Sequence, residues 1–229
     1  MAAGFAFLGF GFTLTGAFDM ATDKDAEKDK ATIEVYRELM AEAKMRLDAV
    51  WQAVHGKITA VPHLLVAEFC FLQLRMIAEL VAVGCLVAHE DIPATQTKKF
   101  RSEFMADKLM KLLSELHPEF FPRPASITRT GEHELHMEPI KEGSMTKEEF
   151  IGLVNLCGRV LHRSPLKKLL SPSSAVQTSF EEIDHYAQQM SNLLRIHFVT
   201  RLGGATIIVC TMKTSETDDN VQVVITKAM

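Results

Sequence analysis

The sequence lacks the short motifs that identify many enzymes and cofactor-binding proteins. It has no GxSxG turn, no Gly-rich phosphate loop and no CxxC pair. Its four cysteines are scattered, each inside an apolar stretch, at Cys70, Cys85, Cys157 and Cys210. Thiols in such surroundings are typical of buried, reduced side chains of cytoplasmic proteins. We therefore expect a cytoplasmic protein, and the sequence indicates no cofactor.

The sequence also lacks a large excess of charge of either sign. Its 25 Lys and Arg residues and 29 Asp and Glu residues give a formal net charge of −4. This balance provides no general attraction to nucleic acid or to an anionic membrane, so binding to either would need a local basic patch. With 229 residues, 47% of them hydrophobic, the chain is long enough to bury the core of a globular protein.

Residues 1–19 are apolar and rich in glycine, but they do not resemble a targeting or membrane-spanning segment. No Lys or Arg precedes Lys24, whereas a secretory signal begins with basic residues. Glycine and threonine divide the stretch into pieces too short to span a bilayer, and a polar protein start follows at Met20. We expect residues 1–19 to be a disordered extension or a misassigned translation start, with an unusual export signal as the alternative. Residues 20–229 are expected to form a single globular domain.

Helical periodicity dominates the chain from Met20 onward, because apolar residues recur there every three or four positions. We predict five helices, at about residues 25–55, 63–89, 97–116, 147–162 and 174–192. The fourth begins at a capping box formed by Thr146 and Glu149. Between the third and fourth helices, alternation around Gly131 is compatible with a short hairpin.

At the C-terminus the period changes to that of a strand. Residues 194–202 alternate, Gly203 and Gly204 predict a tight turn, and two more strand-like stretches follow. Residues 193–229 are therefore predicted to form a three-stranded antiparallel β-meander. The predicted fold class is α+β and mainly α, with about five helices in a bundle-like arrangement over residues 20–192 and the meander packed on them.

The stretch EHELHME contains the densest run of possible metal ligands. Imidazole and carboxylate groups suit zinc, iron or manganese. On a strand, Glu134, His136 and Glu138 would share one face, while His133 would lie on the other. A metal site here would need a further ligand from elsewhere, so a solvated loop or edge strand is the simpler interpretation.

Arg129, His133 and His136 are the candidate catalytic residues. The separation of Arg129 and His136 is similar to that of the Arg and His with which HEPN-type ribonucleases polarise the scissile phosphate. That similarity would imply an all-helical ribonuclease acting on RNA. The sequence departs from the family pattern, because Thr130 and Gly131 predict a turn where the family has a helix. No family is therefore assigned.

The stretch LRIHFVTRL predicts a basic strand face. Alternation places Arg195, His197 and Arg201 on the face opposite the apolar residues. Such a row could hold phosphates of RNA, DNA or a nucleotide, or it could simply be solvated. No aromatic residue joins the row, so stacking on single strands has little support, and nucleic acid is the weaker of the partners considered.

The stretch from Leu64 to Glu90 is long and apolar enough to raise the question of a membrane span. Glu68, Arg75 and Glu79 lie within it, and each would cost about 2 to 3 kcal/mol near a bilayer centre, so we expect no membrane span. At 100° per residue the three charges fall on one stripe of the helix. If the helix is buried all round, they form a hydrogen-bonded network at the core, at an interface or along a ligand cleft. Loss of Arg75 would then cost about 3 to 5 kcal/mol.

These features favour a binding or self-association module whose partner is a second copy or another protein. Long amphipathic helices supply dimer surfaces, and twelve methionines favour adaptable apolar contacts. The alternative is a hydrolase acting on nucleic acid, either metal-dependent or using Arg and His as a ribonuclease does.

Overall fold

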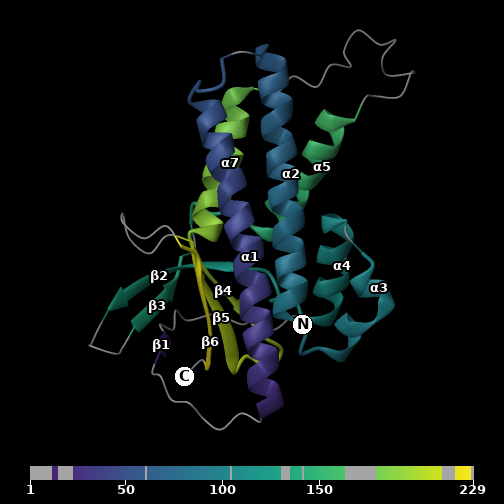
Figure 1. Ribbon diagram of the computed structural model, residues 1–229, viewed down its shortest axis with the longest axis vertical. Coiled ribbons are helices and arrows are strands. Elements are labelled where there is room, and N and C mark those ends of the chain that lie inside the picture. The colour runs from purple at the N-terminus through teal and green to yellow at the C-terminus, as the bar shows by residue number, and fades with distance from the viewer. Residues whose placement is uncertain are drawn as a thin grey trace, which may run out of the picture.

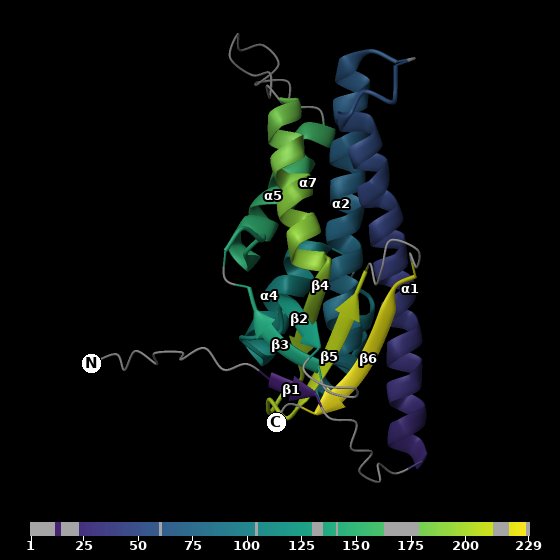
Figure 2. The ribbon, with the colours of Figure 1, turned by 90° about the vertical axis from the view of Figure 1, so that its left-hand side faces the viewer.

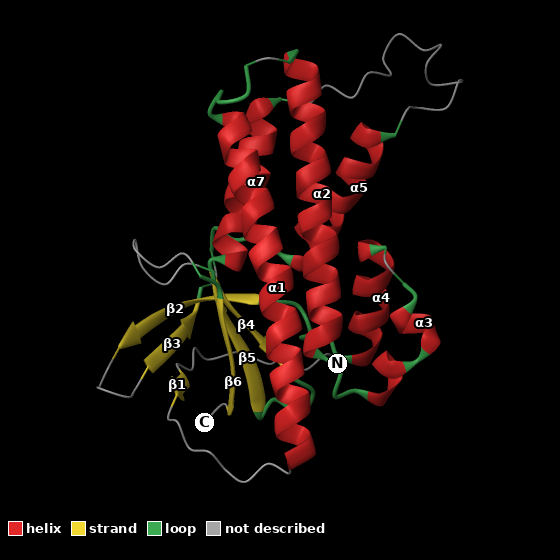
Figure 3. Cartoon of the chain, viewed as in Figure 1, coloured by secondary structure: helices red, strands yellow, loops and turns green. Residues whose placement is uncertain are grey.

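The fold combines a group of helices with one antiparallel sheet, as the sequence predicts at the level of fold class. The computed structural model describes residues 12–14, 23–59, 61–103, 105–129, 135–140, 142–162, 179–212 and 220–227. The helices run along the long axis of the molecule, and the strands lie at one end of it, beside the lower half of α1 (Figures 1 and 3).

Two long antiparallel helices form the centre of the helical part (Figure 1). Beside them lie short helices and one 3-10 turn. The bounds are α1 Asp23–Val54, α2 His63–Ala88, η1 Pro93–Gln96, α3 Lys98–Arg101, α4 Ala106–Leu116, α5 Lys147–Leu161 and α7 Phe180–Leu194. The first two helices and the expected capping box at Thr146 match the sequence analysis.

Close packing of α1 on α2 depends on Gly84. A Cβ atom at this position would lie 3.2 Å from the Cε atom of Met40 and 3.3 Å from Cε2 of Tyr36. Both of these α1 side chains are fully buried, at a spacing of four residues that keeps them on one face of the helix. The small residue on α2 therefore makes room for two large ones on α1.

Within the described residues the sheet has six strands in the order β1-β3-β2-β4-β5-β6, and all neighbouring strands are antiparallel. Their bounds are β1 Phe12–Leu14, β2 Arg123–Arg129, β3 Leu135–Pro139, β4 Ile196–Thr200, β5 Thr206–Thr211 and β6 Gln222–Lys227. Figure 2 shows β6 beside α1. Gly203 and Gly204 have φ of +93° and +78°, which suits glycine in the turn between β4 and β5.

The structure differs from the predicted elements in three places. The β-meander is not a separate unit, because Arg123 and Pro124 of β2 pair with Phe198 and His197 of β4 and so join it to the β2–β3 hairpin. The predicted third helix is divided into α3 and α4, and η1 precedes it. Residues 12–14, expected to lie in a disordered extension, form an edge strand on β3, while residues 1–11 and 15–22 lie outside the described residues. A pattern of apolar residues within one segment carries no information about these long-range pairings.

Candidate functional site

The charged stripe predicted on α2 exists, but it faces outward. Arg75 Nε donates to Glu79 Oε1 at 3.0 Å, and both side chains are about one-third exposed. Glu68 is exposed and makes no hydrogen bond or ion pair with any described residue. The buried three-residue network expected from the sequence is therefore wrong. An exposed pair four residues apart on a helix contributes only about 0.3 to 0.5 kcal/mol.

Large apolar side chains accompany these charges on the same face of the helix. Leu64 is 65% exposed, Leu65 48% and Leu72 44%, and Val61 immediately before α2 is 42% exposed. Four of the ten exposed large hydrophobic residues in the described part of the chain thus lie within twelve positions. We call this surface the α2 stripe, and it consists of Val61, Leu64, Leu65, Glu68, Leu72, Arg75 and Glu79.

The α2 stripe has the spacing of a helix-packing seam. Its members at 61, 65, 68, 72, 75 and 79 are separated alternately by four and three residues, which keeps them along one side of a helix. The opposite side of α2 is buried against α1, α4, α5 and α7, with Cys70, Leu74 and Ile77 fully inaccessible. A helix apolar on both sides therefore uses one side within the fold and presents the other at the surface.

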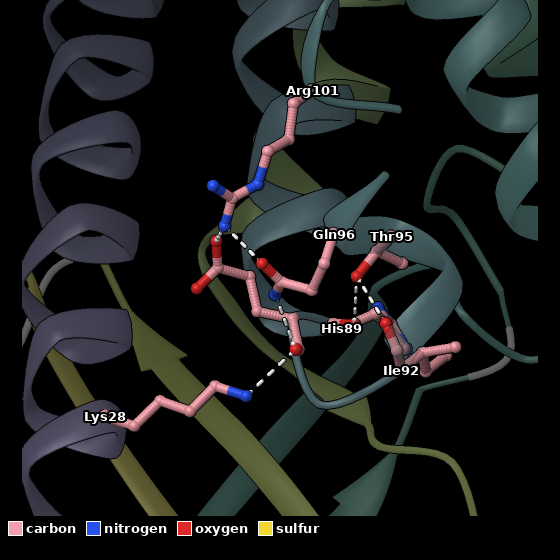
Figure 4. Close-up of polar contacts among 7 residues, drawn as sticks. Lys28, His89, Ile92, Thr95, Gln96 and Arg101 are labelled. Atoms are coloured by element: carbon pink, nitrogen blue, oxygen red, sulfur yellow. Dashed lines mark hydrogen bonds and ion pairs between the residues drawn. The ribbon is translucent and has the colours of Figure 1, made fainter. Parts of the chain in front are cut away.

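The two ends of α2 differ in how firmly they are held. Beyond its C-terminus, Lys28 Nζ and Gln96 Nε2 donate to the carbonyl oxygen of Glu90 at 3.0 and 2.8 Å (Figure 4). Thr95 Oγ1 donates to the carbonyls of His89 and Ile92 at 3.1 and 2.7 Å in the same turn. At the N-terminus, Pro62 provides no side-chain cap, and the exposed leucines follow. Side-chain hydrogen bonds thus hold the C-terminal end of α2, whereas its N-terminal end has no side-chain cap and carries exposed leucines.

By length and composition, α2 passes a test for a membrane-crossing helix, and it is the one helix among the described residues that does so. Half of its most apolar window is buried inside the protein. A core helix of a soluble protein meets the same criteria, so this property alone does not distinguish the two situations.

The lower part of the stripe opens into a cleft of about 300 Å³ between α2, α4 and α5. Arg75 and Glu79 line it from α2, and Asp107, Arg159 and His162 line it from the other helices. Arg75 Nη1 lies 3.5 Å from His162 Nε2. Both signs of charge line this open cleft, and its described lining residues include no Ser, Thr or Cys nucleophile. The arrangement suits polar contact with a partner surface better than catalysis.

A second group of titratable residues is buried between the helices and β4. His197 is inaccessible, and its Nε2 accepts a hydrogen bond from the Tyr36 hydroxyl at 2.8 Å while its Nδ1 donates to the Leu194 carbonyl at 3.0 Å. These contacts satisfy a neutral imidazole. Burial lowers the pKa of His197 to about 4 and raises the pKa of Tyr36 well above its usual value.

His89 and His117 meet at one carbonyl of β4. Their Nε2 atoms lie 3.2 and 2.9 Å from the carbonyl oxygen of Thr200, and Nδ1 of His89 donates to the Cys85 carbonyl at 2.7 Å. Burial lowers the pKa of His89, a change that its backbone hydrogen bonds oppose. All three histidines are buried, so we assign them a structural role in joining α1, α2 and the segment after α4 to β4.

The predicted basic strand face does not form. His197 is buried against Tyr36, so it cannot join an exposed row. The Arg201 guanidinium is only 11% exposed, and it donates to Asp29 Oδ1 at 2.7 Å and to the Ala88 carbonyl at 3.3 Å. Arg195 is exposed but caps α7. Helix α1 covers a face that the alternation alone assigned to solvent.

The hairpin candidates are only partly described. His136 and Glu138 share one face of β3, as expected, with Nε2 and Oε1 3.3 Å apart. Strand register pairs His136 with Thr128, and Arg129 with Leu135, so the proposed Arg129 and His136 are not opposite each other. His133 and Glu134 lie outside the described residues. Within the described ranges, no group of three or more His, Cys, Asp or Glu side chains is placed to hold a metal ion.

Sequence reasoning identified the charges of the α2 stripe but missed its leucines and the buried histidines. The alternating spacing of four and three residues, with polar side chains on one seam, could have shown that this seam was accessible. For the histidines no comparable pattern exists, because their hydrogen-bond partners on other elements lie 83 to 161 residues away in the chain. Comparison with protein families, with characterised proteins and with solved structures finds no match to this chain.

Proposed function

We propose that this protein is a self-association module and that the α2 stripe packs against the α2 stripe of a second copy. One observation carries the proposal: three large apolar side chains of α2, with Val61 immediately before it, are exposed along one side of a helix whose other side is part of the core. Contiguous exposed apolar side chains of this kind commonly mark interaction surfaces. The nucleic-acid hydrolase, which rested on Arg129, His133 and His136 or on the basic strand face, is not proposed, because Arg129 and His136 are not opposite each other in the strand register and α1 covers the basic face.

The apolar contact is modest in size, which sets the expected affinity. Burying one half-exposed Leu or Val side chain contributes about 1 kcal/mol. Four such residues from each copy contribute about 8 kcal/mol in total, against a cost of association of about 4 kcal/mol or more. A pair of helices also buries less area than a standard protein interface. The difference of about 4 kcal/mol corresponds to a weak dimer, with a dissociation constant on the order of 1 mM.

A cytoplasmic location belongs to the same proposal. Cys70, Cys85, Cys157 and Cys210 are all buried free thiols, which suits a reducing compartment. Since none of the four is at the surface, disulfide formation would not be the means of association.

Sedimentation equilibrium over about 0.05 to 2 mM tests the proposal, a range that spans the expected affinity. The variant Leu64→Gln with Leu72→Gln removes two apolar side chains from the stripe without touching the core. The matched control is Met45→Gln with Leu202→Gln, which changes two equally exposed residues elsewhere. We expect the wild type and the control to dimerise and the stripe variant to remain monomeric with an unchanged Tm. A wild type that is monomeric throughout, or a stripe variant as dimeric as the wild type, would overturn the proposal.

A further inference from the structure

We infer that the two copies meet through antiparallel α2 helices related by a twofold axis beside Leu72, with Glu68 of each copy opposite Arg75 of the other. This inference rests on the proposed self-association and specifies its geometry. It follows from the positions of the two charges on the stripe, from their partners within the chain and from the symmetry of a closed dimer.

One charge on the α2 stripe has no partner among the described residues. Glu68 is surrounded on the stripe by Leu64, Leu65 and Leu72, and it has no ionic or hydrogen-bonding partner among the described residues. A carboxylate brought between two apolar surfaces without a partner would lose its hydration and weaken the contact. A partner surface that fits this stripe therefore has to supply a cation opposite Glu68.

The α2 stripe itself carries a suitable cation. Arg75 lies on the same stripe, seven residues further along, and only its Nε is used by Glu79. A guanidinium carries five N–H donors in a planar fork, so it accommodates a second carboxylate at its outer edge. Since both charges belong to one stripe, a second copy of the chain presents the required cation.

The positions of these two charges determine the relative direction of the two α2 helices. In a parallel pair, each position faces its own equivalent, so Glu68 would face Glu68 and Arg75 would face Arg75, and both contacts repel. In an antiparallel pair centred midway between positions 68 and 75, each Glu68 faces an Arg75, and Leu72 lies beside the axis. The twofold symmetry forms this ion pair twice. The antiparallel arrangement thus pairs the opposite charges of the stripe and brings the two copies of Leu72 together beside the axis.

A charge-exchange experiment tests the pairing. Glu68→Arg and Arg75→Glu would each place like charges opposite one another at two positions, so we expect each to raise the dimer dissociation constant about tenfold or more. The combined variant Glu68→Arg/Arg75→Glu restores two opposite pairs and should return to within about threefold of the wild type. Because Arg75→Glu also opposes Glu79 within its own helix, far-UV circular dichroism at low concentration confirms that each variant is folded. Failure of the combined variant to regain affinity would overturn the inference.

Cysteine cross-linking tests the direction independently. In the antiparallel arrangement, position 72 of one copy lies about 1.5 Å along the axis from its equivalent, whereas the two copies of position 65 are about 20 Å apart. Helices in contact have axes 8 to 10 Å apart, which brings facing Cα atoms within disulfide range. On air oxidation, Leu72→Cys should give covalent dimers and Leu65→Cys should not. The four native thiols are buried, so the wild type provides the background.

The two proposals fail in different ways. If Leu65→Cys cross-links as readily as Leu72→Cys, the helices are parallel and the inferred geometry is wrong. If the helices are parallel but the Leu64→Gln/Leu72→Gln variant is monomeric where the wild type is dimeric, self-association through the α2 stripe is still supported. If the wild type never dimerises, both the proposed self-association and the inferred geometry are wrong.

Discussion

The buried His197 makes the stability of this protein depend on pH in a predictable direction. The folded protein holds the imidazole neutral between the Tyr36 hydroxyl and the Leu194 carbonyl, with its pKa lowered to about 4. In the unfolded chain the same group protonates near pH 6.5. Between these two values the unfolded state binds more protons than the folded state, so the free energy of unfolding falls as the pH decreases.

The size of the effect follows from the two pKa values. A difference of about 2.5 units corresponds to about 3 kcal/mol when the whole window is crossed. About 2 kcal/mol of this is lost between pH 7 and pH 5, before most carboxylates titrate. Stability from this residue is therefore fully present above pH 6.5 and disappears as the pH falls towards 4. The pKa of His89 is lowered by burial as well, which adds to the loss in the same direction.

Urea unfolding at pH 7, 6 and 5 measures this loss for the wild type and for His197→Gln. Glutamine has an acceptor and a donor that can replace both hydrogen bonds of His197, but it does not titrate. We expect the variant to be less stable at pH 7 and to lose about 2 kcal/mol less than the wild type between pH 7 and pH 5. The control is His185→Gln, which changes an exposed histidine on α7. If His197→Gln and the wild type show the same pH dependence of the free energy of unfolding, the interpretation that His197 is neutral in the folded protein is wrong.

Four further substitutions test an ion pair, a helix cap and the packing at two glycines by urea unfolding at pH 7. Arg75→Ala should lower the free energy of unfolding by less than about 1 kcal/mol, because its pair with Glu79 is partly solvated. A measured loss of about 3 kcal/mol would instead support a buried network. Thr146→Ala removes the capping box of α5 and should cost about 1 kcal/mol, whereas an unchanged midpoint would show that the cap contributes nothing. Gly84→Val should lower the free energy of unfolding by about 1 to 3 kcal/mol, because the new side chain crowds α1. At Gly152 an added Cβ would have no atom within 4 Å, so Gly152→Ala should stabilise α5 by up to about 1 kcal/mol. Equal effects of the two glycine substitutions would contradict the close approach at Gly84.

The helical part of the fold was predictable because its determinants are local. Apolar spacing of three and four residues defines α1 and α2, and the Thr146 capping box defines the start of α5. Alternation likewise defines β4, a short apolar run defines β5, and two glycines define the turn between them. Each of these patterns lies within a few residues of the chain, so the sequence alone determines it.

Only the tertiary structure decided which faces of these elements meet solvent. Strand alternation placed His197 outside, but α1 covers that face and Tyr36 satisfies the imidazole from 161 residues away. The uniformly apolar composition of α2 indicated burial all round, but too few helices surround it, and Leu64, Leu65 and Leu72 remain exposed. Burial depends on which distant segments pack together, and no local period encodes that choice. The same reason applies to the sheet, where pairing of β2 with β4 joins two hairpins that the sequence presents as unrelated.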